Sequence, residues 1–187
     1  RDRFSDSERA AVYKAINERR DIRTYKPTPI DPAILKRIVS AAHQAGSVGF
    51  MQPWNFVIID DIAIRTQVHS HFLSCSKRAA TNYENDRQKT YVSLKLQGLL
   101  DAPINVLITC DTTRGGKHVL GRSEIRETDL YSTCLAVQNF WLAARAEGVG
   151  VGWMSIMQPE SVNEILGIPP HIVPVAYLTV GYATEYP

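Results

Sequence analysis

The chain has 187 residues, of which 44% are apolar and 21% charged, and its formal net charge is +2. This length suits a single domain over residues 1–187, able to bury about two thirds of its unfolded surface. The composition is that of an ordinary globular protein. The small net charge, without a polybasic tract beyond one arginine cluster, argues against a nucleic-acid-binding protein, which usually carries a basic stripe.

The cysteines and the hydropathy pattern indicate a cytoplasmic protein. Cys75, Cys110 and Cys134 are odd in number, lack CxxC spacing, and two of them lie in apolar segments. We therefore expect reduced thiols. No apolar run approaches the roughly 20 residues of a membrane span, and the N-terminus shows no signal-peptide core, so we expect no membrane partner. Since the chain begins without Met and stops just after a predicted strand, we expect the natural protein to be longer.

The first third of the chain predicts two helices and a strand. The first helix covers residues 5–20, with Ser5 and Glu8 at capping-box spacing. The second begins at Asp31, an N-cap that is followed by Pro at the first helical position. A glycine-punctuated loop, AGSVGFMQPW, then leads into a strand over residues 55–60.

The remaining elements predict a mixed fold. Residues 61 to about 100 are helical but polar, and we expect a mobile lid over about 61–98. A buried strand over 104–110 and a long loop follow. The helix over 129–147 is apolar around so much of its circumference that it belongs at the centre or at a subunit interface. Two more strands and a short helix, without regular βαβ alternation, predict an α+β sheet with helices on both sides.

Several short motifs carry no clear function. GVGVGW, residues 148–153, has the glycines of a dinucleotide fingerprint but joins a helix to a strand, which reverses the required context, so we interpret it as a tightly packed strand start. His69 and His71 have no Cys or carboxylate at ligand spacing, so we interpret them as solvated and expect no metal. Ser155 in GWMSI lacks the second glycine of a nucleophile elbow, which leaves it a simple strand hydroxyl on sequence pattern.

The stretch ERRDIR, residues 18–23, poses the main question. Each charge-assisted hydrogen bond to a phosphate contributes roughly 1.5–3 kcal/mol, so Arg19, Arg20 and Arg23 together can anchor a phosphorylated cofactor. Asp21 in their midst repels the same anion. Two interpretations therefore stand equal here: a solvated basic helix end, and a phosphate site in which the carboxylate has a chemical task.

Three segments resemble, in order, the landmarks of the flavin-dependent nitroreductase family: RRDIR, AAHQAGSVGFMQPWNFVII and AVQNFWLAARAEGVGVGWMSI. The resemblance extends over nearly the whole chain. It implies a nitroreductase-like FMN-binding fold, with a central, mostly antiparallel sheet flanked by helices. It also implies an intertwined homodimer with FMN at the interface. A phosphate ligand common near the family's C-terminus has no counterpart before Pro187.

Two departures resemble one branch of that family, the 5,6-dimethylbenzimidazole synthases. Asp21 stands where the ordinary nitroreductase has Ser, and Phe50 where it has Asn. In that branch, reduced FMN is both cofactor and substrate: with O2 it is fragmented to 5,6-dimethylbenzimidazole, the lower-ligand base of vitamin B12, and erythrose 4-phosphate. The resemblance implies no metal, and a separate flavin reductase as the source of reduced FMN.

The resemblance also implies the site residues. Asp21 is expected beside the ribityl chain as general acid and base, and Ser155 at the ring edge near N5. Gly150 and Gly152 are expected to allow the backbone to approach the ring. The full set of expected cofactor-binding residues is Arg19, Arg20, Asp21, Ile22, Arg23, Ser47, Met51, Lys95, Gly150, Gly152 and Ser155.

Two other functions remain open at this point. A conventional NAD(P)H-dependent nitro- or quinone reductase leaves its FMN intact after turnover, and Asp21 argues against it. A flavin-binding module without turnover binds FMN, but in its presence reduced FMN and O2 yield only FMN and peroxide.

Overall fold

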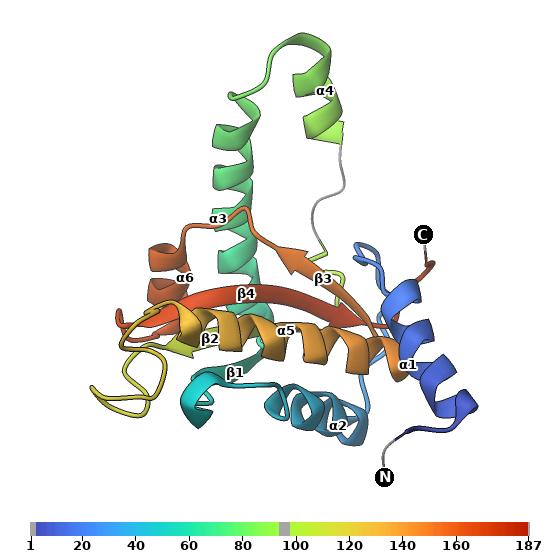
Figure 1. The fold of residues 1–187 in the computed structure, drawn as a ribbon. Helices are drawn as coiled ribbons and strands as arrows, with labels where there is room; N and C mark the ends of the chain where they lie inside the picture. The colour runs from blue at the N-terminus through green and yellow to red at the C-terminus, as the bar shows by residue number, and fades with distance from the viewer. Residues whose placement is uncertain (1–2, 94–97, 187) are drawn as a thin grey trace.

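The computed structural model describes residues 3–93 and 98–186 as one antiparallel sheet with helices on both faces (Figure 1). The strand order is β1-β2-β4-β3. The strands are β1 (Trp54–Ile59), β2 (Ile104–Asp111), β3 (Gly150–Met154) and β4 (Ile172–Gly181). The helices are α1 (Asp6–Glu18), α2 (Pro32–His43), the short 3-10 helix η1 (Val48–Phe50), α3 (Ile62–Ala80), α4 (Asn85–Ser93), α5 (Thr128–Ala146) and α6 (Pro159–Leu166). The predicted α+β architecture is confirmed.

The local signals in the sequence act as expected at the helix ends. The Ser5 side chain accepts from the Glu8 N–H, and the Glu8 carboxylate accepts from the Ser5 N–H at 2.8 Å, which completes the capping box. The Asp31 side chain caps α2. α1 stops two residues before its predicted end because Arg19 adopts extended φ/ψ angles.

The polar segment after β1 is not one continuous helix. α3 ends at Ala80 and α4 begins at Asn85, whose φ of 52° breaks the helical path. Figure 1 shows both helices rising away from the sheet. Whether this segment serves as a lid stays a prediction. Among the described helices, none has the length and apolarity needed to cross a bilayer.

The core has two large apolar clusters, one on each face of the sheet, and a small third cluster around Ile22 and Tyr25. On β2, Val106 and Ile108 belong to the cluster that includes Phe140 of α5, whereas Leu107 between them belongs to the cluster of α3 and α6. This alternation follows from the two-residue period of a strand. Because helices cover both faces of the sheet, the β2 residues that point to either face are apolar.

The first residues after α1 lie against β3, along the edge that β4 does not occupy. Asp21 forms a parallel bridge with Val151, and the Ile22 N–H donates to the Val151 carbonyl at 3.0 Å. A Cβ on Gly152 would lie 2.3 Å from the Ile22 carbonyl oxygen, and one on Gly150 would lie 2.9 Å from the Ile22 side chain. The glycine run is thus confirmed as a tightly packed strand start.

This packing predicts that Gly152→Ala lowers the free energy of unfolding by about 1–3 kcal/mol, since the methyl group overlaps backbone that cannot move aside easily. Urea unfolding measures the change. Gly46→Ala is the matched control, because its Cβ would meet Leu135 Cδ1 at an ordinary 3.6 Å. Equal stability of Gly152→Ala and the wild type would contradict the packing described here.

Candidate active site

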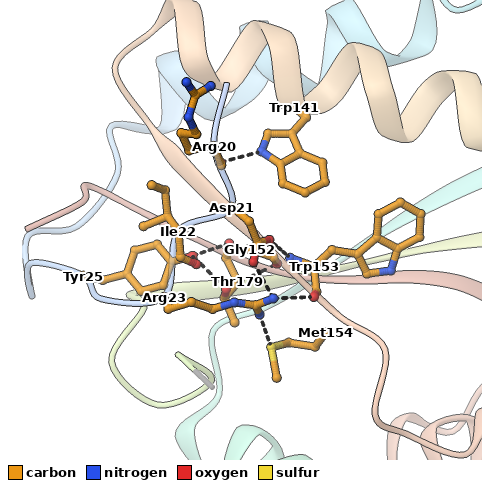
Figure 2. A network of polar contacts seen from close by, with 10 residues as sticks. All are labelled: Arg20, Asp21, Ile22, Arg23, Tyr25, Trp141, Gly152, Trp153, Met154 and Thr179. Carbon is orange, nitrogen blue, oxygen red and sulfur yellow. Dashed lines mark hydrogen bonds and ion pairs between the residues drawn. The ribbon is translucent and has the colours of Figure 1, made fainter. Parts of the chain in front are cut away.

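The Asp21 carboxylate lies at the free edge of β3 (Figure 2). Its Oδ1 accepts a hydrogen bond from the Trp153 N–H at 2.9 Å, and its Oδ2 forms an ion pair with the Arg23 guanidinium. The side chain therefore continues the ladder that the Ile22 N–H begins at Val151. At 36% exposure, the carboxylate is within reach of a ligand in solution.

Arg23 lies against the same strand. Its Nη2 donates to the Trp153 carbonyl at 3.2 Å, and its Nη1 lies 2.9 Å from the Met154 Sδ. The side chain is 25% exposed. Asp21 and Arg23, which the sequence places two positions apart, are thus brought together on β3.

The other two arginines take different partners. The Arg19 guanidinium stacks on the Trp141 ring, with its Cζ 4.6 Å from the ring centre. The exposed Arg20 uses Nη1 to donate to the Asn17 and Arg19 carbonyls at 2.7 and 2.9 Å, and Figure 2 shows it pointing away from Asp21. The three guanidinium groups share one segment but do not converge on one point.

Helix α5 fixes the segment that carries these arginines, a contribution that sequence reasoning missed. The Trp141 Nε1 donates to the Arg20 carbonyl at 3.3 Å, and the Arg145 Nη2 donates to the Glu18 carboxylate at 2.6 Å. The sequence did contain one indication of this contact, because a buried Trp usually needs a partner for its N–H. We missed it because the apolar pattern of the helix indicated only packing in the core or at an interface.

Tyr25 is a second residue that sequence reasoning missed. Its hydroxyl lies 2.8 Å from the Ile22 carbonyl and 2.7 Å from the Thr179 Oγ1, which ties the turn after Asp21 to β4. Burial raises the pKa of the Tyr25 phenol above its ordinary value of 10.0. The Ile22 N–H bonds to Val151 and the Ile22 carbonyl bonds to Tyr25, so the backbone of Ile22 holds the neighbouring Asp21 in position. Gly150 and Gly152 leave the space that Ile22 occupies.

Ser155 follows directly after β3 and is exposed. It lies two residues beyond Trp153, whose N–H donates to Asp21. Because an extended chain rises about 3.3 Å per residue, Trp153 and Ser155 are about 7 Å apart along the chain. Ser155 also borders a cavity of about 220 Å³ between β4 and α6. Asp21 and Ser155 thus lie within the length of one small molecule.

Ser47 and Met51 lie elsewhere. Both belong to the loop before β1, and β1 and β3 are the opposite edges of the sheet, three strand spacings or about 14 Å apart. Within this loop the Ser47 Oγ accepts from the Gln52 N–H at 2.8 Å, and Phe50 and Gln52 hold φ angles of 51° and 46°. One chain does not bring these residues to Asp21. Lys95 lies outside the described residues.

The interpretation of both α3 histidines as solvated was wrong. His71 is half-buried, and its Nε2 accepts from the Gln158 N–H at 3.0 Å and lies 3.4 Å from the Cys75 Sγ. His69 is half-buried beside the Phe72 ring. The reason is that the two histidines lie on either side of the stripe that α3 buries, which includes Val68 and Phe72. Within the described ranges, no group of three or more His, Cys, Asp or Glu residues could hold a metal ion.

Comparison with known proteins decides the family. A sequence model of the nitroreductase family matches residues 16–182. The chain belongs to the nitroreductase family. Among its relatives in that family, a Rhodospirillum rubrum protein named 5,6-dimethylbenzimidazole synthase is 38% identical over 182 residues, covering 97% of this chain and 86% of that protein. A Rhodobacter capsulatus protein of the same name is 34% identical over 178 residues, covering 95% and 86%.

Solved structures confirm the nitroreductase-like fold. An iodotyrosine deiodinase bound to FMN and 3-iodo-L-tyrosine aligns with a TM-score of 0.79 at 19% identity, covering 94% of this chain and 91% of its own. A BluB-like flavoprotein from Clostridium difficile 630 aligns with a TM-score of 0.73 at 18% identity, covering 93% and 90%. At these identities the likeness shows the fold alone.

The raised pKa of Tyr25 predicts how the region around Asp21 responds to alkali. The folded state retains the phenolic proton more tightly than the unfolded chain does, so this contribution to stability is complete below pH 10 and is lost as the pH rises further. The loss is at most about 1.4 kcal/mol per pH unit for one group. Unfolding free energies between pH 9 and 11 should fall less steeply for Tyr25→Phe than for the wild type. The control is Tyr13→Phe, at a 61% exposed position, and its slope should match the wild type. An unchanged slope in Tyr25→Phe would contradict the assignment.

Proposed function

We propose that this nitroreductase-family protein is a 5,6-dimethylbenzimidazole synthase, which uses O2 to fragment reduced FMN to 5,6-dimethylbenzimidazole and erythrose 4-phosphate. The observation that carries the proposal is the Asp21 carboxylate, held on β3 by the Trp153 N–H and accessible from solution. Relatives named 5,6-dimethylbenzimidazole synthase, 32–38% identical over nearly the whole chain, support it.

The described residues fit a phosphorylated flavin. Arg19, Arg20 and Arg23 set three positive charges against the one negative charge of Asp21. The excess of two charges matches a phosphate monoester, which carries about −1.5 to −2 at pH 7. Guanidinium groups are suited to phosphate because they donate in a planar fork. We assign the phosphate to these arginines, which turn toward it on binding from the separate positions that they hold in the structure.

The carboxylate has a task that phosphate binding alone does not explain. Bound reduced FMN supplies the electrons for O2 and the ring that becomes the product. Cleavage of the ribityl chain needs proton transfer at its hydroxyls and its first carbon, and a carboxylate beside that chain can act as general base and acid. Asp21 takes this role, and Ser155, just beyond the end of β3 and about 7 Å further along the chain, contacts the reacting edge of the ring.

We further propose that the complete site contains residues of two copies of the chain. Ser47 and Met51 lie at the opposite sheet edge from Asp21, so a second copy brings them to the flavin. The exposed Tyr131 and Leu135 of α5, at 58% and 53% exposure, and Phe50, at 81%, are apolar surface for that homodimer. Three further features belong to the proposal. A flavin reductase in the same cytoplasm supplies reduced FMN. The α3–α4 segment covers the site, and no metal takes part in the reaction.

The test is to mix the protein with excess photoreduced FMN, to admit air, and to separate the products by chromatography. The proposal predicts 5,6-dimethylbenzimidazole in amounts that exceed the protein concentration. Intact FMN together with direct NAD(P)H oxidation would indicate a conventional reductase instead. Intact FMN and peroxide alone would indicate a flavin-binding module.

Asp21→Asn is predicted to lower the rate of product formation by at least about 100-fold, because general acid–base catalysis typically contributes 10²–10⁴. The affinity for oxidised FMN, measured by flavin fluorescence, should stay within about tenfold, since the arginines remain. Asp6→Asn is the matched control, because Asp6 also pairs with an arginine, Arg9, but has a 94% exposed side chain on α1; it should act as the wild type does. If Asp21→Asn made product at the wild-type rate, the role given to this carboxylate would be wrong.

A further inference from the structure

We propose that His71 is a positioning residue for Ser155. Its neutral imidazole holds the connection between β3 and α6, residues 155–158, and protonation of the ring releases that connection. The proposal rests on the synthase function where it concerns activity, because Ser155 is there assigned to the reacting edge of the flavin. The hold on the connection can be measured without turnover.

The hydrogen bond from α6 to α3 fixes the protonation state of the ring. The Gln158 N–H donates to the His71 Nε2 at 3.0 Å. A backbone N–H can only donate, and a histidine nitrogen accepts only when it carries no proton. The Cys75 Sγ lies 3.4 Å from the same nitrogen and can donate its S–H there as well. A charged ring has an N–H at both nitrogens, so Nε2 would then face the Gln158 N–H as a second donor, and the bond would be lost.

This bond holds the start of α6. Gln158 is the N-cap residue of the helix, and within the described residues its side chain makes no capping hydrogen bond. The first N–H groups of a helix have no partners inside the helix, and His71 supplies an acceptor for one of them from α3. Gln158 is exposed, so water can take over its N–H when the ring becomes charged. Loss of the bond therefore loosens the connection without requiring α6 to unfold.

Ser155 lies on this connection, between two fixed points. β3 ends one residue before Ser155 and pairs with β4, whereas Gln158, three residues after it, bonds to His71. A misplacement of about 1 Å in a group that must meet the reacting atoms can lower the rate by roughly 10²-fold. His71 thus acts on Ser155 through the backbone of the connection.

The surroundings of His71 contain several other titratable and charged groups. On α3 itself, the Arg78 Nη2 donates to the Cys75 Sγ at 3.1 Å, and His69 is half-buried two residues before His71. The elements packed against α3 carry Glu160 and Glu164 on α6, Asp86, Arg87, Lys89 and Tyr91 on α4, and Tyr177 of β4 in the shared apolar cluster. Among these side-chain types, histidine is the one that ordinarily changes its charge between pH 5 and 8. His69 is therefore the residue from which the test must distinguish His71.

Hydrogen exchange of the Gln158 amide, followed by NMR, measures the hold on the connection directly. The protection factor, which corrects for the intrinsic exchange rate at each pH, should be about fivefold higher at pH 7.5 in the wild type than in His71→Ala, the equivalent of one ordinary hydrogen bond. Between pH 7.5 and 5.5 it should fall in the wild type. It should stay constant in His71→Gln, because the amide oxygen of Gln accepts the same N–H and does not titrate. His69→Gln is the matched control on α3 and should follow the wild type, because His71 is the residue that bonds to Gln158.

The rate of 5,6-dimethylbenzimidazole formation from reduced FMN tests the effect on Ser155. The wild-type kcat should fall as the pH drops from 7.5 to 5.5, by at most about tenfold per pH unit, which is the limit for one proton. The ratio of the wild-type kcat to that of His71→Gln cancels the titration of Asp21 and of the flavin. This ratio should fall with the same midpoint as the protection factor of Gln158. His71→Ala should have a low kcat at every pH, and thermal melting verifies that each variant is folded.

The exchange experiment on the wild type decides the matter even if a variant fails to fold. A Gln158 protection factor that is the same at pH 7.5 and 5.5 would overturn the release by protonation. A pH response that disappears in His69→Gln would overturn the assignment to His71. A protection factor that falls while the ratio of the kcat values stays constant would overturn the effect on Ser155 and leave the synthase function standing. Absence of 5,6-dimethylbenzimidazole at every pH would overturn the synthase function, while hydrogen exchange would still decide whether His71 holds the connection.

Discussion

The hydrogen bond from the Trp153 N–H to the Asp21 carboxylate is the constraint on which the site depends. β4 pairs with one edge of β3, and on the other edge the backbone N–H of Ile22 donates to the Val151 carbonyl. Strand N–H groups need acceptors, and here a side chain takes the place of a second peptide. The carboxylate is thereby fixed to a rigid element. Gly152 makes this arrangement possible, since any side chain there would displace Ile22.

This arrangement explains why an aspartate occurs among arginines. Asp21 and Arg23 neutralise each other on β3, while Arg19 and Arg20 keep two further positive charges available on the same segment. Trp141 holds that segment from α5 through a ring face and an indole N–H. Charge attraction to a phosphate and access to a carboxylate are therefore combined within a few residues, and neither excludes the other.

Most elements of this fold were predictable from sequence because their signals are local, whereas the break between α3 and α4 was not predicted. The capping box at Ser5, the Asp31 N-cap and the glycine helix stop depend on residues that are neighbours in the chain. Contacts between distant segments were not predictable. Tyr25 reaches β4 across more than 150 positions, and His71 meets the loop before α6 only because α3 packs there. Neither contact leaves a trace in spacing or composition.

The synthase function requires that the Asp21 carboxylate lie against the ribityl chain of a bound flavin. A crystal structure of the protein with oxidised FMN would show this contact. An Asp21 carboxylate oxygen should then lie within about 2.6–3.2 Å of a ribityl hydroxyl, with the phosphate among the three arginines. A carboxylate turned to bulk water, or a phosphate bound far from ERRDIR, would contradict it.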